Sequence, residues 1–173
     1  MVLEMKRASI LGIFGTSFII IFSAPVLSSG VKEDKFFKDW SIHIIGKKDK
    51  KICYIYSEPK KKSGKYKIRG SVYMQVTHRM AERARNEVSI TAGYTFKKDS
   101  AVSVKIDKKT FSMYTDGATA WSQDDAALVA AMRAGKSMNV IGTSKRGTVT
   151  KDRYSLSGFT AAHKAINRAC HKK

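Results

Sequence analysis

The chain has 173 residues, of which 33 are lysine or arginine and 14 are aspartate or glutamate, so its formal net charge at pH 7 is +19. A charge of this size favours anionic polymers or anionic membrane surfaces as partners, because it attracts them over long distances and releases their counterions. The alternative is a basic protein whose charge only reflects the proteome of its organism. The sequence contains no internal repeat, low-complexity tract or linker, which excludes an array of small domains.

The first thirty residues have the three-part pattern of a secretory signal peptide. A short basic start contains Lys6 and Arg7, an uncharged apolar run follows over residues 8–24, and small residues lie at 28–30. Cleavage after residues 28–30 would leave a single domain at 31–173 that keeps +18 of the charge, without a transmembrane span. A retained anchor helix is the alternative, although the run is slightly shorter than the roughly 20 residues that span a bilayer. The cut carries no cysteine, so a lipoprotein anchor is excluded.

The mature part of the chain consists mainly of short strand patterns separated by turns. Residues 31–39 are predicted to be a polar lead-in that docks through Phe36 and Phe37, and residues 60–65 a lysine-rich hairpin loop. Residues 79–87 have the composition of a short helix or of a loop. Nine segments have the alternation or the β-branched composition of strands, namely 40–45, 52–57, 69–78, 88–94, 101–106, 110–115, 118–121, 137–142 and 148–157.

Two segments are predicted to be helical, at about 123–134 and 158–170. Ser122 resembles a capping residue for the first, an alanine-rich run continues it, and Gly135 ends it. Short strands at about ten-residue spacing with only two helices predict a mainly β fold, either an antiparallel β-sandwich or an open barrel. The alternative is an α+β sheet with both helices on one face.

Two cysteines, Cys53 and Cys170, allow a single intramolecular pairing. Because an exported chain meets an oxidising compartment, we expect a disulfide that pins the last helix to an early strand. The alternative is two unpaired small core residues. The four histidines are scattered, without the spacing of metal ligands, so neither a metal site nor another cofactor is predicted.

The sequence predicts no catalytic residue. It contains no nucleophile elbow, no phosphate-binding loop and no dinucleotide-binding glycine pattern. A small periplasmic hydrolase with an unrecognised site is the alternative function.

Candidate binding residues are basic and lie in two groups. Arginines can bind phosphate or carboxylate through two parallel hydrogen bonds, unless they pair with nearby acids, whereas lysines add more diffuse attraction. The first group is His78, Arg79, Arg83 and Arg85, with Glu82 and Glu87 as competing acids, and the second is Lys60, Lys61 and Lys62.

Tyrosines also interleave with basic residues between positions 54 and 73. Basic surfaces with aromatic side chains bind single-stranded nucleic acid or glycans. For an exported protein we expect no nucleic acid as a partner. The expected partners are anionic envelope glycans, lipid headgroups or an acidic envelope or host protein.

Several strings of the mature chain resemble the invasion-associated locus B family of exported proteins of Gram-negative bacteria. These strings are FKDW at 37–40, CYIYSEP at 53–59 and YSLSGFTAAHKAINRAC at 154–170, together with segments 76–94 and 116–135. The resemblance covers the mature chain nearly end to end, and none of these strings is a catalytic motif. It implies a periplasmic, outer-membrane-associated or secreted protein with a non-catalytic binding or structural role, linked in some family members to host-cell invasion and virulence.

Overall fold

A computed structural model describes residues 35–171, so the predicted signal peptide lies outside the described residues. Eleven strands and two α-helices make up this part, with one short 3₁₀ turn at Lys48–Lys50. The strands are β1 (Lys35–Phe37), β2 (Trp40–Ile45), β3 (Ile52–Ser57), β4 (Lys61–Gly64), β5 (Tyr73–Arg79), β6 (Ala84–Thr91), β7 (Val102–Ile106), β8 (Lys109–Asp116), β9 (Thr119–Ser122), β10 (Ser137–Thr143) and β11 (Val149–Ser155). The helices are α1 (Asp125–Ala134) and α2 (Phe159–His171).

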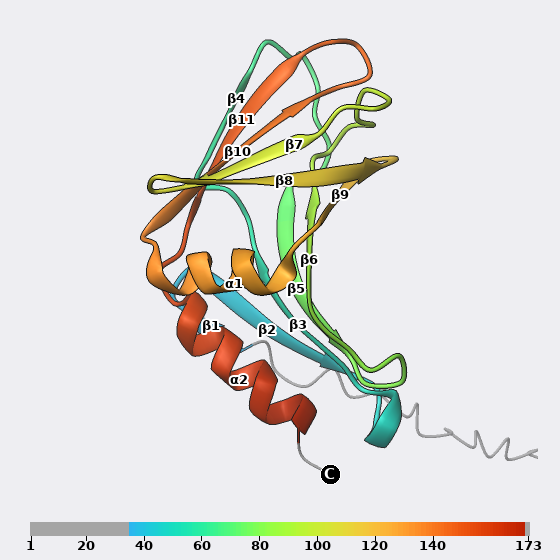
Figure 1. The fold of residues 1–173 in the computed structure, drawn as a ribbon, viewed down its shortest axis with the longest axis vertical. Helices are drawn as coiled ribbons and strands as arrows, with labels where there is room; N and C mark the ends of the chain where they lie inside the picture. The colour runs from blue at the N-terminus through green and yellow to red at the C-terminus, as the bar shows by residue number, and fades with distance from the viewer. Residues whose placement is uncertain (1–34, 172–173) are drawn as a thin grey trace, which may run out of the picture. The chain divides into compact units, whose positions relative to one another are not determined.

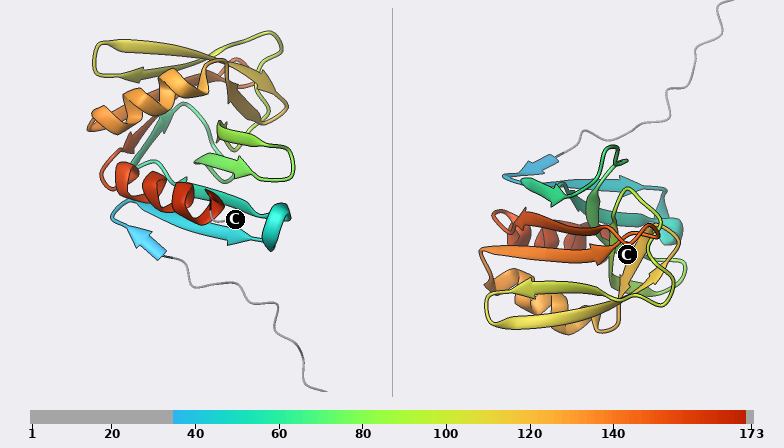
Figure 2. Two further views of the ribbon diagram at one scale, coloured as in Figure 1. Left: turned by 60° about the horizontal axis from the view of Figure 1, so that its bottom comes forward. Right: turned by 90° about the horizontal axis from the view of Figure 1, so that it is seen from above.

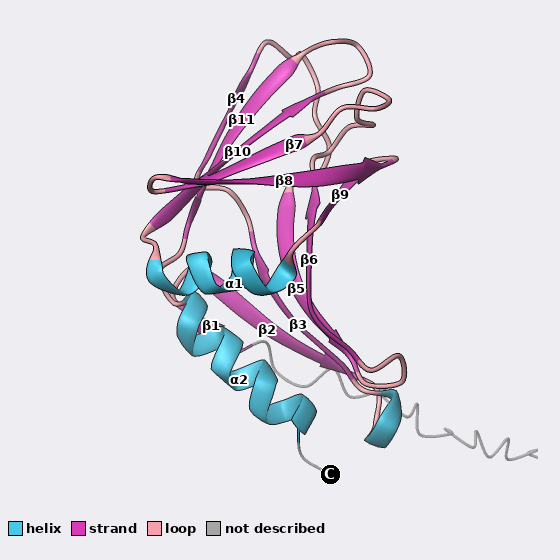
Figure 3. Ribbon diagram, in the orientation of Figure 1, coloured by secondary structure: helices cyan, strands magenta, loops and turns pink. Residues whose placement is uncertain are grey.

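The strands form one antiparallel sheet that is not closed, in the order β1-β2-β3-β5-β6-β9-β8-β7-β10-β11-β4. The sheet bends, and both helices lie on its concave side (Figures 1 and 3). Two further views show the helices on this same side (Figure 2). The predicted mainly β, open antiparallel fold with two helices is therefore confirmed, and both helices cover one face of the sheet.

The concave face carries a single apolar core, because every second residue of each strand points to it. Val102, Val104 and Ile106 of β7 supply one row of buried side chains, and α1 adds Leu128 and Met132. No helix among residues 35–171 is long and apolar enough to cross a membrane.

Strand pairing corrects three sequence predictions. Residues 61–64 are not a hairpin loop but the edge strand β4, which pairs with β11 while β3 pairs directly with β5. A short lysine-rich strand suits an edge, where charge discourages pairing with other molecules, but it has no apolar alternation to reveal it. Residues 35–37 form β1, in which Phe36 is exposed and only Phe37 packs against the core. Residues 84–87 belong to β6 rather than to a helix or loop.

Helix α1 begins two residues later than Ser122 predicts. The Asp124 carboxylate caps it by accepting a hydrogen bond from the backbone N–H of Ala127 at 2.9 Å, and Gly135 ends it as predicted. The neighbouring Asp125 carboxylate accepts a hydrogen bond from the Val88 N–H of β6 at 3.0 Å. This contact occupies a backbone donor just before the β6–β9 pairing begins, and it fixes α1 against the sheet.

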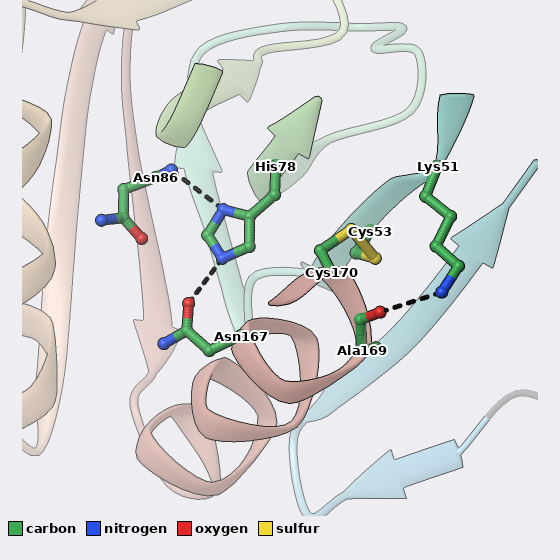
Figure 4. The surroundings of a disulfide bond; sticks show 7 residues. All are labelled: Lys51, Cys53, His78, Asn86, Asn167, Ala169 and Cys170. Carbon is green, nitrogen blue, oxygen red and sulfur yellow. Dashed lines mark hydrogen bonds between the residues drawn. A yellow bond between two sulfur atoms is a disulfide. The ribbon is translucent and has the colours of Figure 1, made fainter. Parts of the chain in front are cut away.

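Helix α2 is fastened to the sheet at both ends. Cys170 forms the predicted disulfide with Cys53 of β3, with their Cα atoms 6.1 Å apart, and Lys51 Nζ donates a hydrogen bond to the Ala169 carbonyl at 3.2 Å (Figure 4). At the other end Gly158 has φ +91°, and a Cβ atom there would lie 1.8 Å from the Phe37 carbonyl oxygen. Only glycine therefore permits this close approach.

Replacing Cys170 with serine should lower the free energy of unfolding by about 5 kcal/mol, because the disulfide closes a loop of more than one hundred residues in the unfolded chain. Chemical denaturation measures this loss, and hydrogen exchange should show faster exchange along α2. Reductant should destabilise the native protein to a similar degree and leave the Cys170→Ser variant unchanged. Equal stability of the oxidised protein and the variant would contradict the prediction.

Candidate functional site

The predicted arginine group does not form one uniform binding surface. His78 is buried on the concave face, whereas Arg83 and Arg85 are exposed near the β5–β6 turn. Arg79 lies between these extremes and bonds its own acids, with Nη2 at 2.7 Å from Glu87 Oε1 and Nε at 3.8 Å from Glu82 Oε2. The competing acids that the sequence offers are thus engaged by Arg79.

His78 instead belongs to a closed ring of buried hydrogen bonds between β5, β6 and α2. The Asn86 N–H donates to His78 Nδ1 at 3.0 Å, and His78 Nε2 lies 2.7 Å from Asn167 Oδ1 (Figure 4). Asn167 Nδ2 lies 3.4 Å from His163 Nδ1, and His163 Nε2 lies 2.7 Å from Asn86 Oδ1. Because the backbone N–H can only donate, the ring is satisfied when both imidazoles are neutral and protonated at Nε2.

The surroundings keep His163 neutral. Burial, together with the nearby His78 and Arg133, lowers the pKa of His163 to about 4. Protonation at Nδ1 would also place a donor against the Asn167 amide and break the ring. The four side chains therefore hold α2 against the sheet. The hydrogen bonds of the ring connect these residues with one another and do not point to a substrate.

Lowering the pH from about 6.5 to 4 should destabilise the protein by about 3 kcal/mol through His163 alone, because the unfolded chain binds a proton there that the folded chain does not. The stabilisation is complete above pH 6.5 and is lost as the pH falls to about 4. Denaturation curves at several pH values, compared between the native protein and His163→Phe, isolate this contribution from other groups. The variant should be less stable at pH 7 and should show a flatter pH dependence. An unchanged slope in His163→Phe would refute the assignment.

A basic surface lies on the convex side of β4, β11, β10 and β7. Lys61 of β4 pairs with Arg153 of β11, Arg153 pairs with Asn139 of β10, and Asn139 pairs with Lys105 of β7. Directly paired residues of antiparallel strands point to the same face, as does Lys151, two residues from Arg153. The four cations Lys61, Lys105, Lys151 and Arg153 are exposed, and we call them the basic face.

Only one of the three predicted lysines belongs to the basic face. Lys60 forms an ion pair with Asp39 at 2.5 Å, and Lys62 pairs with the buried Asp152 in register, which places it on the other side of the strand. The lysines are also separated from the arginines, since Arg79 pairs with Ile52 at the start of β3 and Lys60 follows the end of that strand. A six-residue strand is about 20 Å long, so the two predicted groups lie at different ends of the sheet.

A second surface feature is a groove of about 630 Å³ over the outer face of β2, β3 and β5. The His43 and Tyr54 rings stack there at 4.7 Å between centroids, and the Tyr56 and Tyr73 rings lie 5.2 Å apart. Tyr56 donates a hydrogen bond from its hydroxyl to Glu58 at 2.8 Å, and burial together with this carboxylate raises the pKa of Tyr56 to about 12. The phenol is therefore protonated at neutral pH. We call this feature the aromatic groove.

Charged residues at the groove pair with one another. The Asp39 carboxylate contacts Lys60, and that hydrogen bond, with a further one to Ser155, lowers the pKa of Asp39. Ser41 Oγ lies 2.8 Å from His43 Nε2. Of the residues that line this groove, the sequence indicated Phe36, Lys60 and the tyrosines. It did not indicate the other polar residues, because they come together only when β2, β3 and β5 pair.

Within residues 35–171, no three histidine, cysteine or acidic side chains are grouped so that they could hold a metal ion. The model of the Invasion associated locus B (IalB) protein family matches residues 40–167. The chain belongs to this family. A crystal structure of invasion associated protein B from Bartonella henselae is similar to it, with a TM-score of 0.56 and 19% sequence identity, covering 80% of this chain and 97% of that one. No curated protein matches the chain.

Membership in the IalB family confirms the resemblance that the sequence strings indicate, and the structural similarity shows that the fold is shared. IalB family proteins are associated with the bacterial envelope, and the family is not a known enzyme family. The disulfide fits a protein of an oxidising compartment.

Proposed function

We propose that this IalB family protein is exported, acts without catalysis, and binds anionic glycans of the bacterial envelope through the basic face. The observation that carries the proposal is the cross-strand register of β4, β11, β10 and β7, which gathers four exposed cations on one side of the sheet. Family membership supports an envelope location. A contribution to host interaction would follow if the bound glycan belongs to a host surface.

The positive charges of the basic face repel one another, and a bound anion would reduce this repulsion. Lys61 and Arg153 are directly opposed on neighbouring strands, and like charges in this position destabilise a sheet. Lys151 adds a third positive charge within two residues of Arg153. A bound phosphate or carboxylate group would turn this repulsion into attraction, and Arg153 supplies the fork that can hold such a group with two hydrogen bonds.

The dimensions favour a polymer over a single small anion. Neighbouring strands lie about 4.8 Å apart, so Lys61 on β4 and Lys105 on β7 are separated by about 14 Å. This distance is longer than one phosphate group, and a polymer with repeated charges can contact both ends. Such binding weakens as salt screens the charges.

Replacing Lys61 and Lys151 with glutamine should weaken binding of deacylated lipopolysaccharide, which carries phosphate and carboxylate groups, by about tenfold at low salt, equivalent to about 1.4 kcal/mol. Isothermal titration at two salt concentrations measures the effect, and raising the salt concentration should reduce the difference in affinity between the native protein and the variant. The matched control is Arg83→Gln with Arg85→Gln, which removes the same net charge from another surface. Equal losses in the two double variants, or binding only to vesicles of anionic lipid, would contradict the basic face as the glycan site.

A second candidate function is hydrolysis, which is favoured by the 2.8 Å contact between Ser41 Oγ and His43 Nε2. A serine activated by an adjacent histidine is the usual arrangement of a nucleophile and its base. Ser41 is only 6% exposed, however, so its hydroxyl is poorly placed to attack a substrate carbonyl.

We expect no hydrolysis that depends on Ser41. The measurement is turnover of a p-nitrophenyl ester series by the native protein and by Ser41→Ala, with Ser63→Ala on β4 as the control. Rates should be equal in all three proteins. A loss of turnover in Ser41→Ala alone would establish the hydrolase instead.

A further inference from the structure

We infer that the aromatic groove on β2, β3 and β5 is a binding site for a neutral saccharide. This site is separate from the basic face, and the inference does not depend on the proposed function. It rests on three properties of the groove: its aromatic rows, its polar groups and its charge balance.

The rings form two neighbouring pairs along the groove. His43 and Tyr54 come from adjacent positions of β2 and β3, and their planes differ by 14°. Tyr56 and Tyr73 follow toward β5, with planes inclined by 33°, and the His43 and Tyr56 rings meet edge to face at 6.3 Å. Sugar rings present rows of C–H groups that pack on the electron-rich faces of such rings. A row of aromatic side chains therefore fits a chain of sugar units better than it fits a single compact ligand.

Hydrogen-bonding groups lie among the rings. The Gln75 side chain lines the groove from β5 and offers both a donor and an acceptor, and the Glu58 carboxylate, already bonded to the Tyr56 hydroxyl, has further acceptor capacity. Ligand sites typically combine an apolar lining with a few polar groups that fix orientation. Sugar hydroxyls both donate and accept, and this mixture of groups complements them.

Charge distinguishes the groove from the rest of the protein. The chain as a whole carries +19, but the charged groups that line the groove balance, with Lys38 and Lys60 against Asp39 and Glu58. Two of these four already neutralise each other in the Lys60–Asp39 ion pair. Balanced charge gives an anionic ligand no net electrostatic attraction in this site, whereas the basic face would attract it, so the site favours an uncharged ligand. The ligand class is therefore a neutral oligosaccharide.

The experiment titrates the protein, purified after expression of the full-length chain, with three neutral tetrasaccharides. These are the tetramers of β-1,4-linked N-acetylglucosamine, β-1,4-linked glucose and α-1,4-linked glucose. We expect at least one to bind with a Kd below about 1 mM, a typical weak affinity for a shallow site, and to shift amide resonances of β2, β3 and β5 selectively. High salt should leave this binding unchanged, in contrast to binding at the basic face.

Variants then assign the site. Tyr73→Ala should weaken binding about tenfold, Tyr73→Phe should retain most of it because the ring remains, and Tyr114→Ala, an exposed tyrosine of β8 outside the groove, should have no effect. If Tyr73→Ala fails to fold, Gln75→Ala and the resonance shifts decide in its place. The inference would be overturned if none of the three sugars bound at sugar concentrations up to about 10 mM, because a Kd above that value is far weaker than a functional affinity. Shifts confined to other strands, or equal losses in Tyr73→Ala and Tyr114→Ala, would also overturn it.

Discussion

The attachment of α2 to the concave face is the contact on which the rest of this structure depends. An open sheet that bends cannot bury its inner side against itself, so a helix must cover it. The disulfide to β3, the lysine that caps the last turn and the buried ring of histidines and asparagines all act on this one helix. At its start, the Phe159 ring packs edge to face against Trp40 at 5.0 Å, which closes the core beneath β2.

These attachments depend on different kinds of interaction, so they are weakened under different conditions. The disulfide acts by restricting the unfolded chain and is sensitive to reduction. The histidine–asparagine ring acts by satisfying buried polar groups, and it is sensitive to acid, because a protonated imidazole has no acceptor to complete the ring. In the other half of the sheet, the Arg69–Asp152 pair, whose side chains are 4% and 3% exposed and whose contacts measure 2.6 and 2.7 Å, fastens the segment before β5 to β11. Removing one partner of such a pair is costly because the other charge stays buried.

Because the concave face is occupied by the core and both helices, both proposed binding sites lie on the convex face. Strand order divides that face between two chemistries. The β4–β11–β10–β7 end carries paired cations, and the β2–β3–β5 region carries stacked rings with balanced charge. The two surfaces would suit different parts of a glycan-containing envelope, charged groups on one and neutral sugar units on the other.

Local patterns in the sequence were enough to predict most of the elements and the fold class. Strands such as β3 and β7 alternate cleanly, and α1 has its terminating glycine, so their formation depends on neighbours within a few residues. The disulfide was predictable because two cysteines allow one pairing. β4 was missed because its partner β11 is far away in sequence, and β1 was missed because it is only three residues long; neither has an apolar alternation of its own. The positions of the candidate binding residues relative to one another also depend on strand pairing and burial, which the sequence does not show. His78 was grouped with the arginines because it is close to them in sequence. In the structure, its position on β5 directs its side chain into the core, whereas Arg83 and Arg85 are exposed.

The sequence by itself determined the basic charge, the export pattern, the strand-rich class and the family, since each of these is written in composition or in short strings. Only the tertiary structure decided which charges stand together. Lys61 and Lys105 are 44 residues apart in sequence and share a face because β11 and β10 bridge their strands. It also decided that His78 and His163 are structural, because the ring that they complete needs two strands and a helix brought together. Such sites arise from strand register and burial, which depend on contacts between distant segments and not on the order of neighbouring residues.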